Sequence, residues 1–340
     1  MADPKPKRDL YAEVTAKLIA QIERNPGDPK MPWRRTAGAP LWMPANALTE
    51  NHYRGINVLT LWATAEEKGY SSNIWATYKQ YQELGAQVRG GEKSALVIKY
   101  GEYEVEPKDG DPLDDGKRLF AKAAYVFNSQ QVDGWTAPER PASLGPIEKI
   151  ERARLFIAST GAVIKIGGER AFYRPSTDEI HMPDEGLFTG TDTMNRAESW
   201  HAVEAHEAIH WTSHSSRLNR ELGKRFGDRA YQAEELIAEV GAAMVCAMLE
   251  ITQDVRADHA QYLSHWLELM KSDPKAIFTA ASKASQAVDY LVSLQPKPTP
   301  TPDPADDAEP TQTTDPEPAP RRDDAAIAQR GRARPPEAKR

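Results

Sequence analysis

Apolar positions recur at helical spacing in several stretches of the chain. Near the N-terminus we predict a helix over residues 9–24. A longer one is predicted over residues 231–251, where apolar side chains recur three or four positions apart, so that one face is buried. This stripe consists of Leu236, Val240, Ala243 and Ala247.

Shorter apolar stretches that are bounded by turn residues predict strands. Residues 94–105 and 118–128 are expected to belong to a short sheet, and the acidic stretch 101–115 is expected to be an exposed hairpin tip or loop. Residues 162–183 predict two short strands around a Gly-Gly turn and a third strand after a Pro-Ser-Thr-Asp turn. Strands and helices together predict an α+β fold.

Composition divides the chain into segments. We predict a small mixed α/β N-terminal domain over residues 1–135, a linker at 136–146 and a second domain over 147–295. The remaining residues 296–340 hold 11 of the 26 prolines and no aromatic side chain, which predicts a disordered tail.

The formal net charge of −7 for the whole chain argues against nucleic-acid binding, but this charge is unevenly distributed between the segments. Residues 1–100 carry 14 basic and 10 acidic side chains, whereas residues 131–295 carry 17 basic and 24 acidic ones. A basic front half is therefore followed by an acidic back half, and the front half is the better candidate for binding a polyanion.

Cysteine content and hydropathy indicate where the protein acts. The single cysteine, Cys246, excludes an intramolecular disulfide and a zinc site built from thiolates, and it fits a reducing compartment. No apolar run is long enough to span a membrane, and the charged N-terminus does not resemble a signal peptide. We expect a cytoplasmic protein with no membrane partner.

A metal-site motif stands out in the back half. His206, Glu207 and His210 form the pattern H-E-x-x-H in a segment without Pro or Gly, so both histidines can lie on one face of a helix. Such a pair binds Zn²⁺, although other divalent metals are also compatible, and Glu207 beside the open coordination position can act as a general base. The motif predicts a zincin-like metallopeptidase domain.

The third ligand is expected from the following helix. Glu235 is the main candidate, with Glu239 one turn later placed to hydrogen-bond a ligating histidine, while Glu234 points about 100° away and is weaker. His214 can reach the metal only if the helix ends before it. Tyr231 and His214 also remain candidates for stabilising a transition state.

Aromatic and basic side chains alternate in the front half. Such a mixture is typical of surfaces that bind single-stranded nucleic acid, because bases stack on flat side chains and cations follow the backbone. Packing in a core is the alternative reading for each aromatic residue. The candidates are Trp33, Arg34, Arg35, Tyr53, Arg54, Trp75, Tyr78, Lys79, Arg89 and Lys93.

The order of these motifs resembles the ArdC-type antirestriction proteins. The resemblance covers roughly residues 8–290. It requires the motifs of the front half to be followed along the chain by those of the back half. The matching segments are 53–59, 74–80, 84–93, 126–134, 206–220 and 234–243.

The resemblance implies a protein of a plasmid or mobile element. It implies an N-terminal domain that binds single-stranded DNA, a C-terminal metallopeptidase-like domain, and protection of incoming DNA from host restriction. Two alternatives stay open at this point. The metal site is either an active zinc endopeptidase that cleaves a restriction-system or DNA-bound protein, or a zincin fold used only for structure and docking.

Overall fold

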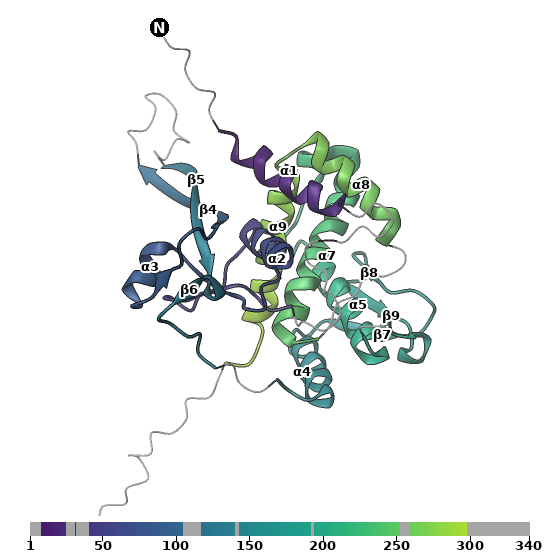
Figure 1. The fold of residues 1–340 in the computed structure, drawn as a ribbon. Helices are drawn as coiled ribbons and strands as arrows, with labels where there is room; N and C mark the ends of the chain where they lie inside the picture. Colours follow the sequence, from purple (N-terminus) through teal and green to yellow (C-terminus); the bar gives the residue numbers. More distant parts are fainter. Residues whose placement is uncertain are drawn as a thin grey trace, which may run out of the picture. The chain divides into compact units, whose positions relative to one another are not determined.

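The computed structural model describes residues 8–24, 31, 41–104, 117–139, 143–191, 194–251 and 259–297. The described residues up to Pro296 form one compact unit. The described residues have the mixed α/β fold that the sequence predicts (Figure 1). The predicted Pro-rich tail lies outside the described residues from position 298 onward.

The front half begins with the helix predicted at 9–24. This helix, α1 (Leu10–Ile22), starts at Asp9, whose carboxylate accepts hydrogen bonds from the amides of Tyr11 and Ala12. Helix α2 (Ile56–Lys68) ends where Gly69 takes up a left-handed conformation.

The described residues of the front half also include six strands. Strands β1 (Ala45–Asn46), β2 (Ile74–Ala76), β5 (Lys117–Asn128) and β4 (Ala95–Glu104) form one sheet in this order. Strands β4 and β5 pair antiparallel along a long ribbon (Figure 1), and the acidic segment that joins them falls in residues 105–116, outside the described residues.

The remaining elements of the front half are short. Helix α3 (Tyr78–Glu83) begins with a capping box made by Thr77 and Gln80. Strands β3 (Gln87–Val88) and β6 (Val132–Asp133) form an antiparallel pair, and α3 contacts β3.

The back half is mainly helical. Helix α5 (Arg196–Trp211) packs against α7 (Ala230–Leu249), and α7 packs against α9 (Ala276–Ser293), as Figure 1 shows. Within the described residues, no helix combines the length and the apolar character that a membrane crossing requires. The helices are α4 (Pro146–Ala158), α5 (Arg196–Trp211), α6 (Gly223–Phe226), α7 (Ala230–Leu249), α8 (His259–Ser272) and α9 (Ala276–Ser293).

A small sheet adjoins α5. Its strands β7 (Val163–Ile166), β8 (Phe172–Arg174) and β9 (Glu179–Met182) lie in the segment where the sequence predicts three strands. Their order is β7-β9-β8, with β9 parallel to β7 and antiparallel to β8. Both β8 and β9 contact α5, so the sheet supports the helix that carries the metal-site motif.

The front and back halves share one hydrophobic core. Val14 of α1 and Leu59 of α2 belong to the same buried cluster as the apolar faces of α5, α7 and α9. Polar contacts join the same elements, since the Thr15 hydroxyl donates to the carbonyl of Pro274 at 2.7 Å and Arg54 forms an ion pair with Asp289.

Candidate metal centre

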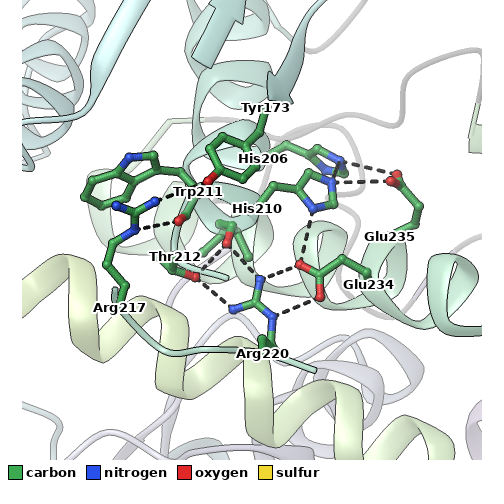
Figure 2. Close-up of polar contacts among 10 residues, drawn as sticks. Tyr173, His206, His210, Trp211, Thr212, Arg217, Arg220, Glu234 and Glu235 are labelled. Carbon is green, nitrogen blue, oxygen red and sulfur yellow. Dashed lines mark hydrogen bonds and ion pairs between the residues drawn. The ribbon is translucent and has the colours of Figure 1, made fainter. Parts of the chain in front are cut away.

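The two motif histidines and one glutamate converge in the back half. His206 and His210 lie one turn apart on α5, and Glu235 faces them from α7 (Figure 2). The Nε2 atoms of the histidines are 3.2 Å apart. Glu235 lies 3.6 Å from His206 Nε2 through Oε2 and 3.4 Å from His210 Nε2 through Oε1. In the described part of the chain, these three residues form the group able to hold a metal ion.

These separations fit a tetrahedral zinc site. Ligand atoms about 2.1 Å from a tetrahedral ion lie about 3.4 Å from one another. The observed values are 3.2 Å between the two Nε2 atoms, and 3.4 and 3.6 Å from these atoms to the two different oxygens of Glu235. Two imidazoles and one carboxylate are also a donor set that Zn²⁺ accepts. The residues present therefore fit the divalent metal that a zincin-like fold implies.

The electrostatic setting of the site comes from its carboxylates. Burial disfavours the protonated ring of His210, but hydrogen bonds to Glu234 and Glu235 and the charge of Glu207 outweigh it and raise the pKa of His210 to about 10. Burial likewise opposes ionisation of Glu235, but its contacts with His206 and His210 lower its pKa well below the ordinary value. The site is thus built to stabilise positive charge.

Glu234 has a role that the sequence does not indicate. Its Oε1 lies 3.3 Å from His210 Nδ1, and both of its oxygens accept hydrogen bonds from the guanidinium of Arg220. Burial opposes ionisation of Glu234, but Arg220 and His210 lower its pKa to about 2. Helical spacing places Glu234 off the ligand face and gives no sign of Arg220, which reaches it from a loop.

Two further acids, each next to or facing His206, are buried. Glu207 is 4% exposed and directly follows His206 on α5. Glu239 is 1% exposed, and its Oε2 lies 3.8 Å from Nδ1 of His206. Glu239 is thus on the side of His206 away from the Nε2 atom that faces Glu235.

Neither alternative candidate lies in the ligand group. Helix α5 ends at Trp211, so His214 is off the helix, and its Nδ1 is 2.8 Å from the Ser216 hydroxyl. Tyr231 is in the first turn of α7 and is 59% exposed.

A second buried arginine holds the end of α5 against the small sheet. The Arg217 guanidinium lies over the Trp211 ring, 3.9 Å from its centre, and donates to the Trp211 carbonyl. It also forms an ion pair with Asp178 and donates to the Tyr173 hydroxyl at 3.3 Å. Figure 2 shows Arg217 and Arg220 on separate branches of the network that surrounds the end of α5.

One predicted DNA-binding residue has to be corrected. Trp75 is 1% exposed and packs with Leu61, Ala95 and Val126, so it is a core residue and offers no surface on which a base can stack. The reason is that its side chain lies on the face of the sheet that Leu61 of α2 covers. Trp33, Arg34 and Arg35 lie outside the described residues.

The remaining candidates differ in how far they are engaged. Tyr53 is partly buried, and its hydroxyl contacts Asn46 and the carbonyl of Trp75. Arg54 is paired with Asp289, and Arg89 is exposed but binds Glu92, Asp133 and two backbone carbonyls. The other candidates are exposed: Tyr78, Lys79 and Lys93.

Fold and site define the back half as a zincin-like metallopeptidase domain, and comparison with known proteins agrees. Residues 151–283 match the family model described as a zincin-like metallopeptidase, and residues 8–127 match the N-terminal domain of anti-restriction factor ArdC. The crystal structure of the antirestriction protein ArdC from plasmid R388, free of metal, has a TM-score of 0.68 and 41% identity over 84% of this chain and 98% of that one. The chain belongs to the ArdC antirestriction family.

Other relatives extend this picture. The uncharacterized protein y4eC of Sinorhizobium fredii is 43% identical over 86% of this chain and 94% of its own length. A DNA primase TraC of Escherichia coli is 35% identical over 86% of this chain, but the match spans only 28% of the primase. A second ArdC structure from plasmid R388, with a TM-score of 0.67 and 41% identity over 84% of this chain and 98% of that one, has Mn(II) bound.

Proposed function

We propose that this protein binds single-stranded DNA with its front half and protects DNA that enters a cell from restriction, in the cytoplasm. Membership of the ArdC family supports this, together with the basic character of residues 1–100. Among the described residues, the exposed side chains of Tyr78, Lys79 and Lys93 are the leading candidates for contacts with DNA, ahead of Tyr53, Arg54 and Arg89, which have partners within the protein. Restriction-system or DNA-bound proteins are the proposed further partners.

We further propose that His206, His210 and Glu235 hold a divalent metal, with Zn²⁺ as the natural ion. The single observation that carries this is the set of ligand separations of 3.2 to 3.6 Å. A metal in this site would supply a Lewis acid and make nearby water more acidic. Glu207 would accept the proton of that water, while Glu239 and Glu234 orient the two histidines.

A peptidase acting on a DNA-associated protein is the second candidate function. The observation in its favour is Glu207, a carboxylate kept in the buried surroundings of the ligands with its charge acting on His210. A zincin fold that serves only for structure and docking does not require an acid at this position.

Wild-type protein and two full-length variants separate these functions. Restriction of unmodified DNA is measured during transfer into a restricting host that carries wild-type protein, Glu207→Gln or His206→Ala. Loss of protection with Glu207→Gln, while bound metal is retained, supports the peptidase. Full protection by both variants refutes a role of the metal site in protection.

The DNA-binding proposal has its own test. We expect wild-type protein to bind a labelled single strand more tightly than the matching duplex, with affinity that falls as salt rises because phosphate contacts release counterions. Equal binding of both forms, or no binding of either, contradicts it.

A further inference from the structure

We propose that Arg220 is a positioning residue of the metal centre. It acts through Glu234 to fix the His210 ring, and it ties together the two helices that carry the ligands. This inference rests on the metal centre proposed above.

Arg220 contacts both ligand helices. It lies in the loop after α5 and directly follows Asn219 in the sequence, which has a left-handed backbone (φ +43°). Its side chain is 1% exposed. The guanidinium donates to the Ile209 carbonyl of α5 at 2.9 Å and to the Thr212 hydroxyl at 2.8 Å, and its Nε donates to Glu234 of α7 at 2.9 Å.

The contact continues from Glu234 to a ligand. Glu234 Oε1 lies 3.3 Å from His210 Nδ1, on the opposite side of the ring from the Nε2 atom that faces Glu235. A proton on Nδ1 that is shared with this carboxylate leaves the lone pair of Nε2 free for a metal. Arg220, Glu234 and His210 thus form a chain that sets the tautomer and the orientation of the ring.

Arg220 also separates the roles of two adjacent acids. Glu234 and Glu235 are neighbours on α7, and either carboxylate could approach a cation bound by the histidines. Because Arg220 engages both oxygens of Glu234, this carboxylate is held away from the ligand position and Glu235 fills it.

Arg217 provides a matched control. It comes from the same loop, its side chain is 7% exposed, and it likewise binds a carbonyl near the end of α5 and an acidic partner. Its partners are Trp211, Asp178 and Tyr173, none of which belongs to the ligand group found among the described residues.

The experiment uses the full-length variants Arg220→Gln, Arg220→Lys and Arg217→Gln. Zn²⁺ affinity is measured by competition with a chromophoric chelator, thermal stability is measured on metal-free protein, and the visible spectrum is recorded with Co²⁺ in place of zinc. Loss of a group that orients a ligand costs about 10- to 100-fold in metal affinity. We expect this loss, and altered Co²⁺ bands, for Arg220→Gln, with partial recovery in Arg220→Lys.

The control decides between positioning and general stability. Arg217→Gln should lower the melting temperature by a similar amount but leave Zn²⁺ affinity within about twofold of wild type, well below the loss expected for an orienting group. Equal losses of affinity in both variants, or unchanged affinity in Arg220→Gln, overturn the inference. If Arg220→Gln does not fold, Glu234→Gln takes its place, because it keeps the size of the side chain and removes the charge. Absence of metal binding in wild-type protein would overturn the metal centre itself.

Discussion

Gly241 determines how closely the two ligand helices approach. It lies on α7 against the fully buried Ile209 of α5. A Cβ atom at position 241 would come 2.8 Å from both Cδ1 and Cγ1 of Ile209. The histidines and Glu235 come from these same two helices, so this contact contributes to the ligand spacing.

Replacing Gly241 by alanine should therefore destabilise the protein. At an open helix position the change stabilises by about 1 kcal/mol, whereas overpacking of a core costs about 1–3 kcal/mol. Urea unfolding of metal-free protein measures the difference. In an Ile209→Ala background the added methyl group has space, so Gly241→Ala should lower the free energy of unfolding by less. A gain in stability from Gly241→Ala alone would contradict the close contact.

Trp75 and Tyr78 are only three positions apart, but we expect their replacement to affect different properties, stability for Trp75 and DNA binding for Tyr78. Trp75→Ala removes a core side chain and should lower the free energy of unfolding by about 3–5 kcal/mol. Tyr78 is 42% exposed, so Tyr78→Ala should leave the melting temperature nearly unchanged and weaken binding of single-stranded DNA. Thermal melting and fluorescence anisotropy with a labelled oligonucleotide test both. Unchanged DNA affinity in Tyr78→Ala would remove this residue from the proposed interface.

At the scale of elements, the turn between β8 and β9 is fastened to the end of α5. Asp178 in this turn has a left-handed backbone (φ +55°) and pairs with Arg217. The hydrogen bond from Arg217, followed by that from Tyr173, holds the pKa of Asp178 below its ordinary value of 3.8 despite partial burial.

This pair makes stability depend on pH. Because the folded protein binds the Asp178 proton more weakly than the unfolded chain, the pair stabilises above pH 3.8, and the contribution is lost as pH falls through the lower folded pKa. Asp178→Asn keeps the shape and tolerates the backbone conformation. We expect the variant to be less stable than wild type at pH 7, with the difference shrinking toward pH 2 in urea unfolding. A difference independent of pH would contradict the ion pair.

At the scale of the whole molecule, the two halves are separate family domains along the sequence but one unit in packing. The buried faces of α1 and α2 contact the back half, α1 against α8 and α2 against α9. Lys271 of α8 also pairs with Glu23 at the end of α1.

We therefore predict that Met1–Pro296 unfolds in a single cooperative transition. A fragment of residues 1–135 would lose the contacts of α1 with α8 and of α2 with α9, including the hydrogen bond from Thr15 to Pro274 and the ring contact of Tyr11 with Phe278. It should be much less stable than the full protein. Calorimetry of both proteins tests this. Two separate transitions, with the fragment melting at the temperature of one of them, would contradict the shared core.

Local patterns determined much of this protein. Helix α1, helix α7 and the three strands beside α5 follow from apolar spacing and turn residues, which act over a few neighbours in the chain. Helix α5 follows from a segment without Pro or Gly. The motif of His206, Glu207 and His210 is local in the same sense, because one helical turn aligns its histidines. Glu235 was predicted because helical spacing puts it on a face beside the apolar stripe.

Tertiary structure decided what distant segments do together. The link from Arg220 through Glu234 to His210 joins a loop, a second helix and a ligand, and no spacing rule connects residues 14 and 24 positions apart in this way. The same holds for Trp75, whose neighbours rather than its type make it a core residue, and for Gly241, whose small size matters only because Ile209 lies against it. Periodicity reports which side of an element is buried, whereas packing alone determines what it is buried against.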